Sequence, residues 1–293
     1  MTRRKMIRRM FLHVLPISSL FGHLSVSGKP AASGPGTRRS VNLAQAWGTL
    51  EGLVTSNSAQ TRKYAIGALE LIAGKHSMAR KLIERTLATD KDAEVRSYAA
   101  SSLGQGKIRA AMPALRTALR DNDAAVAFAA AKALADMGDR SGSDLFQKVL
   151  RGETAETPGL IEGAIRDAKR TMRDPKQLAL IGVREAAGAL LGPASMAITF
   201  AEEGLKDKGA TARALSARLL AADKSEASRQ ALLYGLGDSN TLVRVAACQG
   251  LAMQGNRSSL PQIEALLDGK NEAIRAMAAS SVIRLSAHSS RNE

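Results

Sequence analysis

The sequence predicts an all-α fold: a right-handed α-solenoid of about 14–15 helices stacked in antiparallel pairs, with no sheet. The first observation behind this prediction is a repeat with a period of 31 residues. Its matching pairs are Val243 and Ile274, Ala247 and Ala278, and Leu251 and Val282. The second observation is composition, because hydrophobic residues make up 45% of the chain and aromatic residues only 3%. Alanine and leucine supply most of the apolar content, and both favour helix.

A second array with the same period lies upstream. Its matching pairs are Val95 and Val126, Ala99 and Ala130, Ala100 and Ala131, and Leu103 and Leu134. The period fails between the arrays, so an irregular helical segment is expected there. The sequence therefore divides into a signal peptide (1–28), a disordered linker (29–40), an N-terminal array (41–151), a degenerate helical central segment (152–206), a C-terminal array (207–285) and a tail (286–293).

Each unit contains a helix that reads (V/I/A)-R-x-x-A-x-x-x-L, in which the apolar positions share one face. Glycine favours the left-handed conformation that ends many helices, so the helix before Gly104 is expected to end there. Pro113 is expected near the start of the next helix, where a missing amide costs little. Trp47 is expected to pack against the first repeat, since a terminal helix must cover an apolar end.

Positive charge is concentrated at the N-terminus. Eight basic residues and no acidic residue occur in residues 1–39, so this segment holds +8 of the net charge of +15. The remaining +7 is mild for a dedicated nucleic-acid binder. The basic start, the apolar run over residues 10–26 and the small residues that follow are typical of a signal peptide.

Export to the periplasm or the medium is therefore expected, and Arg8-Arg9 also fits a twin-arginine signal. The alternatives are a cytoplasmic protein with a disordered basic tail and an incorrectly assigned start codon. No stable membrane span is expected in the mature chain, because Arg184-Glu185 and Gly192-Pro193 interrupt the most apolar stretch.

Three aspartate–arginine pairs share a spacing of six residues: Asp90 and Arg96, Asp207 and Arg213, and Asp238 and Arg244. An aspartate that caps a helix, with an arginine one turn inside, can bridge its own loop or that of a neighbouring unit. We interpret these six residues as a structural ladder. The ladder is expected to skip the third unit, because Asp121 precedes Ala127 at this spacing.

Patterns of catalytic or metal-binding residues do not occur in the sequence. The four histidines are scattered, no cluster has zinc spacing, and there is no glycine-rich phosphate loop or serine elbow. Cys248 is the single cysteine and is expected to be a buried small hydrophobic residue. We therefore expect no catalytic residue, no metal and no cofactor.

The units resemble HEAT repeats, in particular the short type also found in phycobilisome lyase subunits. The resemblance covers residues 57–151 and 207–285, through DAEVRSYAASSLG, DSNTLVRVAACQGLAMQG with LPQIEALL, and NEAIRAMAASSVIRL. It implies an α-solenoid of helix pairs whose Val-Arg helices line an inner, concave surface. It implies little about function, because one fold hosts many functions.

Three functional hypotheses follow. The first is a non-enzymatic scaffold that binds a partner protein on its concave surface, with Tyr64, Tyr98 and Phe128 as candidate contacts or, alternatively, as packing between units. The second is nucleic-acid binding, by resemblance to HEAT-like DNA glycosylases. The third is a bilin-lyase-like role, which rests on the repeat resemblance alone. The identity of the partner and the oligomeric state stay open.

Overall fold

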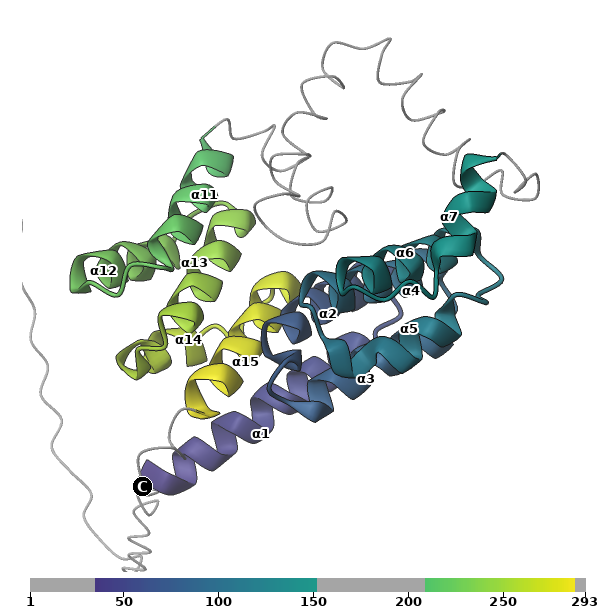
Figure 1. Ribbon diagram of the computed structural model, residues 1–293. Helices are drawn as coiled ribbons and strands as arrows, with labels where there is room; N and C mark the ends of the chain where they lie inside the picture. Colours follow the sequence, from purple (N-terminus) through teal and green to yellow (C-terminus); the bar gives the residue numbers. More distant parts are fainter. Residues whose placement is uncertain (1–34, 152–208, 288–293) are drawn as a thin grey trace, which may run out of the picture.

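The computed structural model describes residues 35–151 and 209–287, which contain twelve α-helices, two 3₁₀-helices and no strand (Figure 1). The N-terminal array holds α1 (Pro35–Val54), α2 (Ala59–Ala73), α3 (Ser77–Thr89), α4 (Ala93–Gln105), η1 (Arg109–Ala111), α5 (Met112–Ala118), α6 (Ala124–Asp136) and α7 (Ser143–Leu150). The C-terminal array holds α11 (Ala210–Leu220), α12 (Glu226–Gly235), α13 (Thr241–Gln254), η2 (Arg257–Ser259), α14 (Leu260–Glu264) and α15 (Glu272–Ser286). This architecture confirms the predicted all-α solenoid.

Several expectations lie outside the described residues. These are the signal peptide, the central segment over 152–206, Asp207, and the end of the tail. Export therefore stays a prediction. Within residues 35–151 and 209–287, no helix combines the length and apolar character that crossing a membrane requires.

The helices form two layers. The first helices of the units pack side by side in the order α11, α13, α15, α2, α4 and α6. The second helices cover them: α12 contacts α11 and α13, α3 contacts α2 and α4, and α7 contacts α6. In Figure 1 this order runs from green through yellow to blue and teal, so the C-terminal array continues the N-terminal one.

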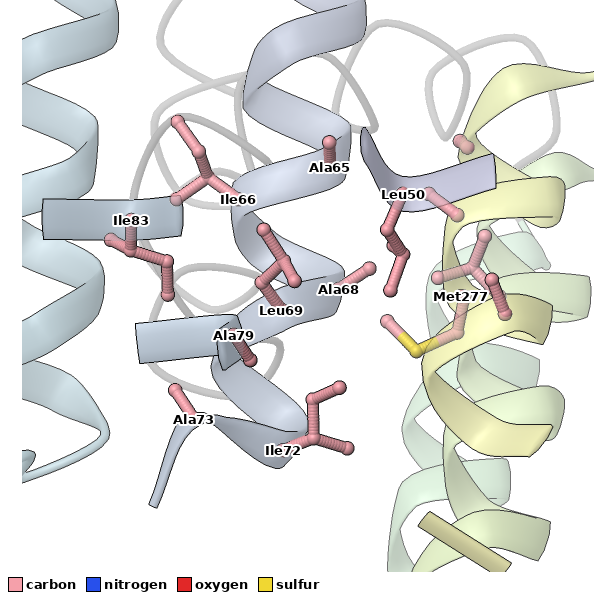
Figure 2. Close-up of a cluster of buried hydrophobic side chains, with 14 of the residues drawn as sticks. Leu50, Ala65, Ile66, Ala68, Leu69, Ile72, Ala73, Ala79, Ile83 and Met277 are labelled. Carbon is pink, nitrogen blue, oxygen red and sulfur yellow. The ribbon is translucent and has the colours of Figure 1, made fainter. Parts of the chain in front are cut away.

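The two arrays meet through α1 and α15, the first and last described helices. α15 packs between α13 and α2, and α1 contacts both α15 and α2. In every other unit a second helix follows its first helix along the chain, but no helix follows α15 within the described residues. α1 occupies that place, so one unit is assembled from the two ends of the described chain. Figure 2 shows Leu50 of α1, Ala68 of α2 and Met277 of α15 in the resulting cluster.

Small side chains allow α15 to occupy this internal position. Twelve of its fifteen residues are buried, and alanine and serine account for most of them. A helix at the end of a solenoid would keep one face exposed, whereas α15 has neighbours on both sides and behind. The last described helix is therefore a central helix of the fold.

Five first helices begin with the same kind of side-chain N-cap, and these caps are not the ladder aspartates that were expected to cap the helices. The N-cap residues of the first helices are Ser58, Asp92, Asp123, Asn240 and Asn271, and the side chain of each accepts a hydrogen bond from an amide in the first turn. Asp90 and Asp238 lie two residues before the cap and do not cap the helix themselves. α1 begins at Pro35, inside the segment 29–40 that was expected to be a disordered linker, and a proline in the first turn suits a helix start.

Gly104 has a different role from the one expected. α4 continues through it to Gln105, and the residue with a left-handed backbone is Lys107, at φ 49°. A Cβ on Gly104 would lie 2.6 Å from the Cβ of Ala133 and 2.8 Å from its Cα. Gly104 therefore lets α4 and α6 approach closely, and the expected helix end was wrong. The expectation for Pro113 is confirmed, because it lies in the first turn of α5.

Substituting alanine at Gly104 should destabilise the fold, because the new methyl group meets backbone that cannot move away. We expect Gly104→Ala to lower the free energy of unfolding by roughly 1–3 kcal/mol in urea denaturation. The matched control is Gly52→Ala in α1, where a Cβ would meet nothing within 4 Å. That control should be neutral or stabilising by up to about 1 kcal/mol, because alanine favours helix. Equal effects of the two substitutions would contradict this packing.

Candidate interaction surface

One stripe on each first helix carries the side chains that face away from the second layer. On α4, Glu94, Ser97, Ser101 and Gln105 recur every three or four residues and are at least partly exposed. The stripes are bonded to one another. Lys63 Nζ on α2 lies 2.9 Å from Glu94 Oε1, and Ser97 Oγ donates to the carbonyl of Ala125 on α6 at 3.5 Å. We call the surface formed by these stripes on the six first helices the inner face.

The middle of the inner face can be followed from helix to helix. The residue nine positions after each N-cap marks it, and in spatial order these are Arg218, Gln249, Ser280, Gly67, Ser101 and Lys132. The outermost members are long and exposed, whereas the central ones are small and Ser280 is fully buried. The inner face is therefore most enclosed where the two arrays meet.

Glu70 is the acidic group of this enclosed region. It lies on α2, and its Oε2 accepts a hydrogen bond of 2.8 Å from Ser102 Oγ on α4. Burial raises the pKa of Glu70 to about 7, against the opposing effects of that hydrogen bond and of the positive charge of Arg218 on α11. Because Arg218 acts on Glu70 from the far end of the stack, side chains from α2, α4 and α11 converge on one part of the inner face.

The three aromatic candidates are packed into the solenoid to different degrees. Tyr98 is 3% exposed and Tyr64 is half-buried against the core. Phe128 is half-buried, and its ring meets the edge of Phe146 with centroids 5.4 Å apart. All three therefore contribute to packing between helices, and their proposed contacts with a partner stay a prediction. Trp47 likewise packs against the core, with His76 at 6.1 Å between ring centroids.

The aspartate–arginine ladder connects neighbouring units. In three places the arginine binds the carboxylate of the next unit, and Arg96 also donates from Nη1 to the backbone carbonyl of Asp90, six residues before it, at 2.9 Å. Arg62 binds Asp90 through two hydrogen bonds of 2.7 and 2.8 Å, and Arg96 binds Asp121 through two of 2.8 Å. In the C-terminal array Arg213 binds Asp238 at 2.8 and 3.0 Å. The expectation that the ladder skips the third unit was therefore wrong for Asp121, which pairs with Arg96.

The described aspartates of the ladder also shape their own loops. Asp90, Asp121 and Asp238 accept a hydrogen bond of 2.9 Å from the backbone N–H of the residue two positions later. This is the geometry of an Asx turn, and the oxygen that closes the turn shares the arginine with the second oxygen. The arginine beside it lowers the pKa of Asp121 and of Asp238 below the ordinary value. One carboxylate thus fixes both the loop and the register of the next unit.

The ladder has gaps on either side of α15. The position that would pair with Arg244 is Gly269, so Arg244 donates instead to the carbonyl of Leu236 at 2.9 Å. The corresponding position for Arg275 is Ser56, which has no charge. Other bonds replace the ladder there, since Arg284 on α15 donates to the carbonyls of Ala252 on α13 and Leu71 on α2, both at 3.1 Å.

Within residues 35–151 and 209–287, no group of three or more histidine, cysteine, aspartate or glutamate residues could hold a metal ion. Cys248 is fully buried, and burial raises the pKa of its thiol to about 12, so the thiol stays protonated and unreactive at neutral pH. Its Sγ contacts Ser281 Oγ at 3.4 Å. These positions agree with a packing role for Cys248.

Comparison with known proteins agrees with this geometry. A family model described as HEAT repeats matches residues 79–166 and 198–284, which is more than half of the chain. The chain belongs to the HEAT-repeat family. Human deoxyhypusine hydroxylase in complex with glycerol is a similar solved structure, with 19% sequence identity and a TM-score of 0.32. The alignment covers 85% of this chain and 98% of that one. No curated protein matches the sequence.

The sequence contained a signal for Glu70 that the motif search did not use. Glu70 stands inside the apolar run Ala68-Leu-Glu-Leu-Ile72, where a carboxylate has buried neighbours on both sides. Arg62 was also missed as a member of the ladder, because its own unit has no aspartate six residues before it. Both residues belong to the HEAT unit that follows the junction with α15.

Removing Arg62 should be costly, because it leaves Asp90 buried without its partner. The side chains of this pair are only 6% and 7% exposed. We expect Arg62→Ala to lower the free energy of unfolding by about 3 kcal/mol or more in urea denaturation. The matched control is Lys132→Ala, whose pair with Asp136 is 65% and 45% exposed. It should change stability by less than about 0.5 kcal/mol. A similar loss in both variants would contradict a structural role for the ladder.

Glu70 should make stability depend on pH. Its pKa is about 7 in the folded protein and near 4.5 when the chain is unfolded, so the folded state holds this proton more tightly. The resulting stability is fully present below pH 4.5 and is lost as the pH rises through 7. As the pH rises from 4.5 to 8, the free energy of unfolding of Glu70→Gln should therefore increase relative to that of wild type by on the order of 1–3 kcal/mol.

Urea denaturation at several pH values measures this difference. The matched control is Glu51→Gln, which removes a carboxylate at an exposed position of α1. A difference between Glu70→Gln and wild type that stays constant with pH would show that Glu70 is not desolvated.

Proposed function

We propose that this HEAT-repeat protein is a non-enzymatic scaffold that binds a partner protein on its inner face, with a basic side chain of the partner placed beside Glu70. One observation carries the proposal: the inner face runs without interruption over six helices from both arrays and becomes most enclosed at their junction. A solenoid offers such an extended surface to a partner chain.

The chemistry of the enclosed region favours a cationic group. Glu70 accepts one hydrogen bond, from Ser102, and burial disfavours its charged form. A guanidinium or ammonium group beside it would restore the charged form and form a charge-assisted hydrogen bond. Gly67 and Ser101, at the middle of the inner face, are small and half-buried.

The charge pattern of the inner face supports a protein over a nucleic acid. Two of its basic residues, Lys63 and Lys132, are paired with Glu94 and Asp136, and a third, Arg218, acts on Glu70, so together they present little net positive charge. Binding to a phosphate backbone depends on unpaired basic residues. A surface with both signs of charge instead suits a protein with a complementary pattern.

Photo-crosslinking tests the proposal. A benzophenone amino acid at Lys132 or Gln249 on the inner face should capture the same protein from an extract of the source cells. The matched control positions are Thr117 on α5 and Gln262 on α14, which are exposed on second helices and should not capture it. Glu70→Gln should reduce the yield at both inner positions at least several-fold. Capture of nucleic acid, or equal capture from inner and control positions, would contradict the proposal.

A further inference from the structure

The outer layer carries a second surface of distinct chemistry, along α3. Two hollows adjoin there and share Arg85. One has a volume of about 340 Å³ and is bordered by the α1–α2 loop, the end of α3 and Lys91. The other, of about 310 Å³, is lined by Ser77, Met78, Lys81, Leu82 and Arg85. We call this surface, defined by Met78, Lys81, Leu82, Arg85 and Lys91, the α3 groove.

The basic side chains of the α3 groove are not neutralised. Lys81, Arg85 and Lys91 are exposed, and no ion pair joins any of them to another residue of the described ranges. Lys81 and Arg85 are also four residues apart on one helix, about 6 Å along its axis, where like charges repel. The neighbouring Arg80 differs, since its Nε lies 3.3 Å from Glu84. The fold thus maintains a local repulsion that a bound anion would relieve.

Several other polar groups of the groove are already bonded within the fold. The hydroxyl groups of Thr55, Thr86 and Thr89 donate to the carbonyls four residues before them, each at 2.9 Å. Arg62 and Asp90 line the larger hollow but bind each other. The charged donors left for a ligand are therefore the cationic groups of Lys81, Arg85 and Lys91, with the neutral side chains of Ser56, Asn57 and Ser77 beside them.

The groove also has an apolar part. Met78 is 42% exposed beside Leu82, one turn before the first of these cations. Methionine adapts its shape to an apolar side chain and is common at binding surfaces. None of the residues lining the two hollows is aromatic, so the groove lacks the stacking platform typical of sites for single-stranded nucleic acid.

From these observations we infer that the α3 groove binds an acidic segment of a protein, with carboxylates on Lys81, Arg85 and Lys91 and an apolar side chain on Met78 and Leu82. Charge complementarity identifies the occupant, and the apolar end distinguishes it from a bare phosphate. The groove lies on a second helix, outside the inner face, so this interaction does not depend on the proposed function.

Fluorescence anisotropy with the full chain tests this inference. The probe is a labelled twelve-residue peptide in which glutamate pairs alternate with single leucines, and we expect it to bind. Lys81→Glu/Arg85→Glu should weaken binding at least tenfold. Lys224→Glu/Lys270→Glu is the matched control, because it changes the net charge equally at exposed positions of the C-terminal array. Its affinity should stay within twofold of wild type.

Two further probes separate the possible occupants. The same peptide with glutamine in place of glutamate, and one with serine in place of leucine, should each bind at least fivefold more weakly. Equal binding of the glutamine peptide, equal binding to both double variants, or preferential binding of a twelve-nucleotide single strand would overturn the inference. Lys81→Gln/Arg85→Gln controls for misfolding. It should also weaken binding of the peptide, while its melting temperature should be at least that of wild type.

Discussion

The burial of α15 between α13 and α2 is the packing on which the rest of the structure depends. Each array alone would end in an exposed apolar helix face, and α15 covers the face of α2 that the N-terminal array leaves open. Only a helix rich in alanine and serine fits, because α13, α2 and α1 all approach it. The continuity of the inner face follows directly, since the stripe on α15 connects those of the two arrays. Glu70 and Arg218 are brought within electrostatic reach by the same packing.

The periodicity of the sequence was sufficient to predict the solenoid and its buried faces. Val95, Ala99 and Leu103 share one helical face, and all three are fully buried. The spatial order of the units could not be predicted in this way. Periodicity shows that two units are alike but not which units are neighbours, and α1 carries no repeat motif that would mark it as the partner of α15. The direction of the ladder was missed for a related reason. Sequence spacing relates Arg96 to Asp90, and its side chain donates to the Asp90 carbonyl, but its carboxylate partner is Asp121 in the next unit.

The site was less predictable than the fold, because its properties depend on desolvation. Tyr98 was a candidate contact because aromatic residues are scarce in this chain. Burial of its apolar ring is also favourable, and the structure leaves the residue only 3% exposed. Glu70 carries no motif, and its raised pKa arises from burial once the units pack, against the opposing effects of Ser102 on α4 and Arg218 on α11. Spacing identifies residues that share a helix face. It does not reveal how much water remains beside them once neighbouring units pack.

The treatment of charge separates the residues that stack the units from those that we propose as contacts for partners. Where charges are buried between units, the fold pairs them with two hydrogen bonds, as in Arg62–Asp90 and Arg96–Asp121. Glu70 on the inner face, and Lys81 and Arg85 on the α3 groove, depart from this rule. Within residues 35–151 and 209–287, Glu70 is a half-buried acid with no bonded cation, and Lys81 and Arg85 are an exposed pair of like charges. Each arrangement costs stability, and neither is needed for stacking. Because the two departures are opposite in sign and lie on opposite layers, they favour two different segments of partner chains, a basic one inside and an acidic one outside.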